Sequence, residues 1–309
     1  MAMKSVVYEA NLVADTHRGP TQAIWADCDV PLLLEQANEG AGGQYIFDDF
    51  NSGVMNVASN VGSFGRWAVY ADTGGTALSG DVEGGVVSIN SDTDNETVTF
   101  NAGMNSFRLV TTSTNALNQQ LWFEARVAKS SIAGTLGDVF VGLFGGFLSG
   151  STGLPQAAIP ITTADALANV DMIGFSSLVG TPTEWSFCYK LTGQTAVQVT
   201  GLTTLMNSVT GAVNTAGAFH KLGFRFDPNA PPVLVTTATG NQTVGQLARP
   251  LIKVFVDGLP AATFLSSLDL VNTNFPTGFM SPGFSVMNST GTTLRLLVDW
   301  IRCAQLPNS

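Results

Sequence analysis

The sequence predicts an all-β protein built as a sandwich of two antiparallel sheets. Three observations support that fold class. Segments in which apolar and polar residues alternate recur along the chain, and residues 121–127 are the clearest of them. Clusters of turn residues, such as Asn51-Ser52-Gly53, separate these segments, and helical patterns are short and rare. Many short strands at this spacing are typical of one large sandwich, which we expect over residues 44–309. The side chains that we expect to be buried include Phe123, Val127, Phe224, Phe255 and Val298.

The composition is poor in charge. Of 309 residues, 45% are hydrophobic and only 12% are charged, against a usual charged share of about a quarter. This balance excludes intrinsic disorder, which needs low hydrophobicity and high charge. The surface must therefore consist largely of Thr, Ser, Asn, Gln and Gly. Few charges have to be desolvated when such a surface binds another protein, so the composition favours a component of an assembly.

The charge balance and the apolar segments exclude two classes of partner. The formal net charge is −10 and the basic residues are scattered, so the electrostatic contribution that drives nucleic-acid binding is missing. The N-terminus lacks the apolar core of a secretion signal. The longest apolar stretch, residues 139–148, contains three glycines and is too short to span a bilayer. We therefore expect a soluble, unsecreted protein with no nucleic-acid and no membrane partner.

Cysteine usage predicts neither a disulfide framework nor a metal site. The three cysteines, Cys28, Cys188 and Cys303, lie far apart in the sequence. Their spacing excludes a disulfide scaffold and any CxxC metal or redox motif. We expect free thiols in a reducing cytoplasm, and no cofactor.

The first 43 residues differ from the rest and predict an extended N-terminal arm. Asp29 is a candidate helix N-cap and Pro31 suits the first helical turn, so a short helix is expected there. Gly-Ala-Gly-Gly at 40–43 is a flexible break that can act as a hinge. We therefore divide the chain into an arm, residues 1–43, and a sandwich, residues 44–309. The alternative is that the arm packs across its own sandwich as an extra edge strand.

Several segments occur in an order and spacing that match a known fold. They are IFDDF at 46–50, LWFEARV at 121–127 followed by VFVGL at 139–143, FHKLGFRFD at 219–227, KVFVDGLP at 253–260, PGFSV at 282–286 and LVDWIR at 297–302. Together they resemble the concanavalin A-like lectin/glucanase (LamG-like) jelly roll, in the version found in virion proteins of tailed phages. The resemblance covers most of the chain after Gly43. It implies the fold rather than the function, because function lies in sites and not in folds.

The resemblance implies a structural virion protein of a tailed bacteriophage that decorates and cements the capsid shell. Such a capsid decoration protein is expected on the outer capsid surface, after synthesis in the host cytoplasm. Its partners would be the major capsid protein and its own copies, as a homotrimer. The alternative is a carbohydrate-binding head or tail fibre protein that recognises host surface glycans through the concave sheet.

Apolar residues of the arm form the candidate interface. If the glycine hinge lets the arm leave the sandwich, these side chains must be covered by something else. They are Ile24, Trp25, Leu32, Leu33 and Leu34. We expect them to contact another chain, either a sister subunit or the capsid.

The residues do not predict an enzyme. Glucanases of this fold carry two glutamates and an aspartate as Glu-x-Asp-x-x-Glu on one strand, and that motif does not occur here. Glu124 lies on a suitable strand, but we expect it to be a solvated side chain. The only histidines are His17 and His220, and no Gly-x-Ser-x-Gly elbow occurs, so a hydrolase triad is not indicated. We assign no catalytic residue and no metal ligand.

Two groups of residues remain as candidates for ligand binding. Asp92, Asp94 and Glu96 could offer oxygen atoms to calcium, with a solvated hairpin tip as the alternative. Trp67 and Trp185 are candidates for stacking on a glycan, with packing in the core as the alternative.

Overall fold

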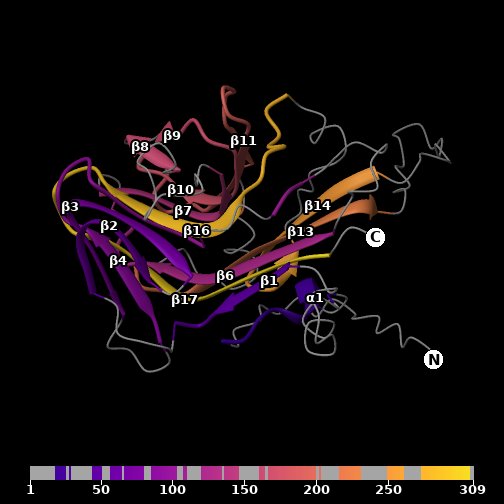
Figure 1. The fold of residues 1–309 in the computed structure, drawn as a ribbon, viewed down its shortest axis with the longest axis horizontal. Helices are drawn as coiled ribbons and strands as arrows, with labels where there is room; N and C mark the ends of the chain where they lie inside the picture. Colours follow the sequence, from indigo (N-terminus) through magenta and orange to yellow (C-terminus); the bar gives the residue numbers. More distant parts are fainter. Residues whose placement is uncertain are drawn as a thin grey trace.

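The computed structural model has the predicted all-β architecture, a sandwich of two antiparallel sheets (Figure 1). The structure describes residues 18–25, 28, 44–50, 56–64, 66–79, 85–102, 107–109, 120–133, 136–145, 160–163, 166–199, 202, 216–230, 249–260 and 273–306. Within these ranges, helix α1 (Gln22–Trp25) has four residues. No helix among the described residues is long and apolar enough to cross a membrane.

The strands follow one another along nearly the whole described chain. They are β1 (Gln44–Asp48), β2 (Asn56–Phe64), β3 (Trp67–Ser79), β4 (Val87–Ser91), β5 (Thr97–Asn101), β6 (Leu121–Lys129), β7 (Gly137–Phe144), β8 (Ile161–Thr163), β9 (Ala166–Leu167), β10 (Met172–Ser177), β11 (Ser186–Lys190), β12 (Val197–Val199), β13 (His220–Ala230), β14 (Arg249–Val256), β15 (Leu259–Pro260), β16 (Ser281–Asn288) and β17 (Leu294–Gln305).

Strand β3 belongs to both sheets and joins them. Its residues 68–71 pair with β5, whereas its residues 75–79 pair with β4. Sheet I therefore runs β12-β11-β10-β7-β16-β5-β3, and sheet II runs β3-β4-β17-β6-β13-β14-β15. Strand β1 pairs with β17 beyond the end of β4, and β2 pairs along β3. The two layers stack face to face around one core (Figure 1).

The core between the two sheets is rich in aromatic rings. Phe224 of β13 stacks on Phe123 of β6 with ring centroids 5.3 Å apart, and it reaches across to Phe187 of β11 at 5.5 Å. The alternating residues Leu121, Phe123, Ala125 and Val127 of β6 all lie in this core. The five residues expected to be buried are buried. Phe255, however, lies on the outer face of sheet II and not between the sheets.

A carboxylate fixes the start of the sandwich. Asp48 ends β1, and its Oδ2 accepts the indole N–H of Trp67 at 2.7 Å. Its Oδ1 accepts the backbone N–H of Phe50 at 2.8 Å. Phe50 has a left-handed φ of 54°, which turns its ring back against Trp67 at a centroid distance of 5.7 Å. The IFDDF segment thus ties β1 to β3 through one buried turn.

Three glycines lie side by side on the outer face of sheet I. Gly142 of β7 pairs with Gly174 of β10 on one side and with Gly283 of β16 on the other. Their missing side chains leave room for the rings of Phe140 and Phe144 to lie against the sheet. A Cβ at Gly283 would fall 2.2 Å from the carbonyl oxygen of Phe100 and 2.6 Å from the ring of Phe144, both closer than packing allows.

We therefore expect Gly283→Ala to lower the free energy of unfolding by about 1–3 kcal/mol, because overpacking forces a ring or a strand to shift. Urea denaturation followed by tryptophan fluorescence measures the change. Gly19→Ala is the matched control, since a Cβ at Gly19 would meet nothing within 4 Å. Equal midpoints for the two variants would show that the glycine row is not needed for packing.

Candidate functional site

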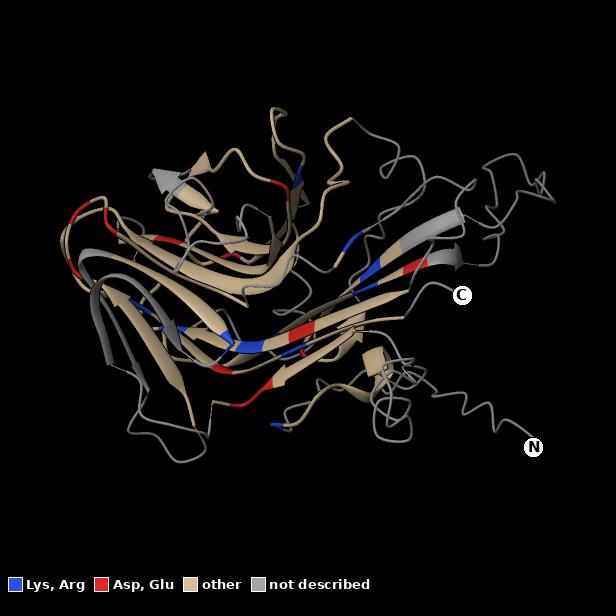
Figure 2. Cartoon of the chain, viewed as in Figure 1, with Lys and Arg blue, Asp and Glu red and all other residues tan. Residues whose placement is uncertain are grey.

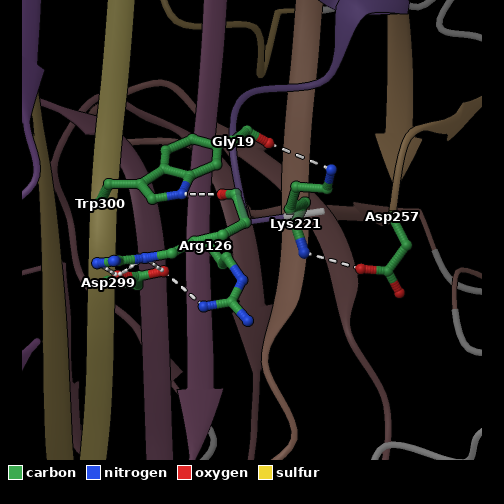
Figure 3. Close-up of polar contacts among 7 residues, drawn as sticks. Gly19, Arg126, Lys221, Asp257, Asp299 and Trp300 are labelled. Carbon is green, nitrogen blue, oxygen red and sulfur yellow. Dashed lines mark hydrogen bonds and ion pairs between the residues drawn. The ribbon is translucent and has the colours of Figure 1, made fainter. Parts of the chain in front are cut away.

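Residues 18–25, which we call the N-terminal strap, lie across the outer face of sheet II. The side chains beneath the strap come from β17, β6, β13 and β14, and Figure 3 draws several of them. They alternate along each strand with the side chains that face the core, so they point away from it. Two neighbouring rows of paired residues run across these strands. The first row is Trp300, Arg126 and Lys221, and the second is Arg302, Glu124, Gly223 and Phe255.

The first row holds the beginning of the strap. The Arg18 guanidinium binds the carboxylate of Asp299, with Nε 3.0 Å from both oxygens. Arg126 binds the same carboxylate from the sheet. The indole N–H of Trp300 donates to the Arg18 carbonyl at 2.6 Å (Figure 3). Asp299 is buried, so the two arginines compensate a charge that would otherwise be costly to bury.

Lys221 links the strap to the β14–β15 turn. Its ammonium donates to the Gly19 carbonyl at 3.3 Å, and its backbone N–H donates to Oδ1 of Asp257 at 2.9 Å (Figure 3). The other Asp257 oxygen lies 2.9 Å from Nδ1 of His220. Asp257 and Gly258 have φ values of 49° and 82°, as a tight Asp-Gly hairpin requires. His220 therefore braces a turn.

Glu124 is the polar centre of the second row. Its Oε2 accepts the backbone N–H of Thr21 at 2.9 Å and the indole N–H of Trp25 at 2.7 Å. Burial raises the pKa of this carboxyl group, and the hydrogen bonds from Thr21 and Trp25 oppose that rise. Its Oε1 has no hydrogen-bond partner. The expectation that Glu124 is solvated is wrong, because the strap covers the outer face of its strand.

The apolar end of the strap packs on its own sandwich. Ile24 lies against the backbone of β13 at Gly223, where a Cβ would fall 2.5 Å from Ile24 Cδ1. Trp25 clusters with Trp122, and the Arg302 guanidinium lies over its ring at 4.1 Å. Ile24 and Trp25, expected at an interface with another chain, are thus buried against their own sheet. The other three expected interface residues, Leu32, Leu33 and Leu34, lie outside the described residues.

The two tryptophans expected to stack on a glycan are buried. Trp67 and Trp185 are each 1% exposed and lie in the core between the sheets. Trp67 packs against Phe50 and Phe284. Neither indole ring offers a face to a sugar, because the sandwich needs both rings to fill its core.

The acidic turn between β4 and β5 has the geometry of a hairpin tip. Asp92 and Asp94 are exposed, and Asn95 has a left-handed φ of 60°. The described residues contain no group of three or more His, Cys, Asp or Glu side chains placed to hold a metal ion. The solvated-turn alternative therefore describes these residues better than a calcium site.

The outer face of sheet I is closed by the β8–β9 hairpin (Figure 1). Ile161 and Ala168 of this hairpin segment are buried together with Phe140, Phe144 and Met172 of the sheet. A glycan therefore cannot lie on this part of the curved sheet, as the alternative function would have required.

One edge exposes an aromatic ring. Phe279 is 55% exposed and precedes β16. The Arg108 guanidinium lies over its ring at 5.2 Å, and Arg108 Nε donates to the Thr277 carbonyl at 2.7 Å. The Gln305 side chain holds the backbone of Arg108 by two hydrogen bonds. The Arg108 N–H donates to Gln305 Oε1 at 3.1 Å, and Gln305 Nε2 donates to the Arg108 carbonyl at 2.6 Å. We call Arg108, Thr277 and Phe279 the Phe279 edge.

Asp171 fixes the loop that carries Phe279. Its Oδ2 accepts the backbone N–H of Gly278 at 2.7 Å. Its Oδ1 accepts the N–H and hydroxyl of Thr192 at 2.8 and 2.6 Å, and its carbonyl accepts the N–H of Gly145 at 2.8 Å. Asp171, through its carboxylate and its carbonyl, thus joins three other connections at this end of sheet I, and the loop that carries the exposed ring is braced.

Three important residues escaped the sequence analysis. Phe279 and Asp171 lie in connections, where the alternation of apolar residues gives no guidance. Gly223 did carry a signal, since a lone glycine inside a strand pattern often marks the close approach of another backbone or side chain. The structure shows that the approaching group is Ile24.

No family model matches this chain, and no curated protein matches it. Solved structures with a similar fold include the carbohydrate recognition domain of Emp47p, with 12% identity over 87% of this chain and 100% of that chain and a TM-score of 0.45. Peanut lectin shows 13% identity over 86% of this chain and 100% of the lectin chain, with a TM-score of 0.45. The endo-1,3-β-glucanase of Streptomyces sioyaensis shows 12% identity over 88% and 99%, with a TM-score of 0.42. The chain is thus similar in fold to concanavalin-like lectins and glucanases. Because both binding proteins and enzymes are among them, this similarity assigns no activity.

A second buried polar cluster lies where β6 ends. The Lys129 ammonium is buried and donates to the Ser177 hydroxyl at 3.1 Å. Burial lowers the pKa of Lys129 from 10.5 to about 8, and the nearby Asp138 carboxylate opposes this shift. Between pH 8 and 10.5 the folded protein therefore binds fewer protons than the unfolded chain. Its free energy of unfolding then rises with pH in that interval.

We expect Lys129→Met to raise the free energy of unfolding at pH 7 by about 1–3 kcal/mol, because the variant no longer buries an amine. The difference in free energy of unfolding between the variant and the wild type should become smaller as the pH approaches 10, because the wild type then buries a neutral amine. Urea denaturation at both pH values measures this. Lys253→Met, at an exposed position of β14, is the control and should leave the pH dependence unchanged. A constant gap would mean that Lys129 does not titrate as described.

Proposed function

We propose that this chain is a non-catalytic binding protein whose ligand is a surface glycan held at the Phe279 edge. The observation that carries the proposal is the exposed Phe279 ring on a braced loop beside Arg108. An aromatic ring packs against the apolar face of a sugar, and a neighbouring guanidinium can donate hydrogen bonds to hydroxyl groups. Phe279 is the more exposed of the two large apolar side chains that the described part of the chain leaves at its surface. Glycan binding also fits the lectin folds to which the chain is similar.

The surroundings of Glu124 support a non-catalytic role. A glycosidase needs carboxyl groups that flank the bond to be cleaved and that reach it together with water. Glu124 is instead fully buried, and two N–H groups of the chain itself occupy its Oε2. In this arrangement a substrate cannot approach its carboxyl group.

Glycan-array and calorimetric titration test the proposal. The wild-type chain should bind at least one class of surface polysaccharide. Phe279→Ala should weaken that binding about tenfold or more, because losing an aromatic contact of roughly 1.4 kcal/mol lowers the affinity tenfold. Phe47→Ala is the matched control, since Phe47 is the other exposed ring, 39% exposed, on β1. Equal affinities for all three proteins would place the sugar elsewhere.

A second candidate function is decoration of a phage capsid, and the distribution of charge favours it. Charged residues are sparse along the described strands (Figure 2). Several of the carboxylates are used inside the molecule, where Asp48, Asp138, Asp171 and Asp257 each accept a backbone N–H. The described part of the surface therefore carries few charges, and docking on another protein desolvates few charges.

Sedimentation with purified empty capsids tests this second function. We expect the wild-type chain to pellet with capsids of its source particle at a fixed number of copies, and free polysaccharide should not release it. Phe279→Ala should pellet equally well, which separates capsid binding from glycan binding. A chain that stays in the supernatant at micromolar concentration would contradict capsid decoration.

A further inference from the structure

We propose that the outer face of sheet II is a peptide-acceptor site, and that a second copy of this chain supplies its own residues 18–25 to that site. The inference goes beyond glycan or capsid binding, because it concerns how copies of this chain join. It assigns the strap as the ligand and the two rows beneath it as the receptor; Figure 3 shows the first of these rows.

The acceptor is built to recognise a particular peptide. The second row crosses β17, β6, β13 and β14 in that order and consists of the guanidinium of Arg302, the carboxylate of Glu124, the bare backbone of Gly223 and the ring of Phe255. The guanidinium covers the indole of Trp25, the carboxylate accepts its N–H, and the glycine makes space for the side chain of Ile24. The peptide class is therefore one with an isoleucine followed by a tryptophan, preceded by a backbone N–H that reaches Glu124.

The neighbouring row fixes the direction of the peptide. Trp300 and Lys221 donate to the consecutive carbonyl groups of Arg18 and Gly19. The Asp299 carboxylate then takes the Arg18 side chain. Reversing the peptide would present neither the two carbonyl groups nor the guanidinium at these places. The site therefore selects a peptide both by its sequence and by the direction in which its chain runs.

An empty acceptor is unfavourable. Glu124 is fully buried under the strap, and only the strap donates hydrogen bonds to its Oε2. Without the strap, water can replace the hydrogen bonds of Glu124, but the apolar side chains of Trp122 and Phe255, which pack with Ile24 and Trp25, would be exposed to water. The site therefore favours an occupied state, whichever copy provides the strap.

Chain connectivity allows the occupant to come from either copy. Residues 26–43 join the strap to β1, and they include Gly40, Gly42 and Gly43. At roughly 3.3–3.6 Å per residue, this connection reaches about 60 Å at most. The strap makes the same contacts with either copy's acceptor, so the binding free energy of the two arrangements is the same. Which copy fills the acceptor therefore depends on concentration. The chain's own strap has an effective concentration on the order of millimolar, and neighbouring copies must reach a comparable local concentration to compete. Exchange is then favoured where copies are crowded.

Cross-linking between two full-length variants tests the inference. One chain carries Ile24→Cys and the other carries Gly223→Cys, whose new Cβ would lie 2.5 Å from its own Ile24 Cδ1 and so displaces its own strap. The chains are co-expressed, concentrated and bridged with a short thiol-specific reagent. We expect a covalent dimer on a non-reducing gel from the pair and not from either variant alone. Each single variant also controls for the native thiols, of which Cys188 and Cys303 are buried and Cys28 is half-buried.

If the gel shows only monomers, even though both chains are folded and both introduced thiols react with a small label, the inference is overturned. If Gly223→Cys does not fold, binding of a labelled peptide of residues 18–25 to full-length Trp25→Ala decides instead. We expect saturable binding by fluorescence anisotropy, weakened at least about tenfold when Glu124→Ala is added, because two hydrogen bonds to a carboxylate are lost. Absence of saturable binding would equally overturn the acceptor site.

Discussion

The constraint on which this structure depends is that both sheets carry apolar side chains on their outer faces as well as in the core. Trp122 and Phe255 point outward from sheet II, and Phe140 and Phe144 point outward from sheet I. A sandwich of two layers covers only its inner faces. The chain therefore needs further covers, and it supplies the N-terminal strap on one side and the β8–β9 hairpin on the other. The site, the buried glutamate and the closed curved face all follow from this requirement.

The covers also explain how a chain with few charges uses them. A cover meets the sheet through its backbone, and its N–H and C=O groups need partners once water is excluded. Lys221 and Glu124 provide them beneath the strap, where Asp299 also binds the side chain of Arg18. Asp171 does the same at the end of sheet I, where three connections meet. Most of the charged side chains named here thus hold irregular backbone in place, although a few, such as Asp92, Asp94 and Lys253, stay exposed.

The sequence was sufficient for the fold class and for the inner faces of the strands. Alternation along residues 121–127 placed Phe123 and Val127 inward, and both lie in the core between the sheets. It was insufficient for the outer faces. Alternation states that Glu124 points away from the core, but it does not state whether a segment a hundred residues away lies on top of it. Trp67 and Trp185 were misassigned to sugar stacking for a related reason, because composition alone does not separate a ring that fills a core from one that stays exposed.

The membership of β3 in both sheets has a mechanical consequence. Layers that touch only through side chains can be peeled apart contact by contact. Here a load that pulls sheet I from sheet II is transmitted along the backbone of β3, whose two halves are laddered to β5 and β4. Separation then has to shear several hydrogen bonds of each ladder at the same moment. Among the described strands, β3 thus ties the two layers together at one edge of the sandwich, so separating the layers there meets the most resistance.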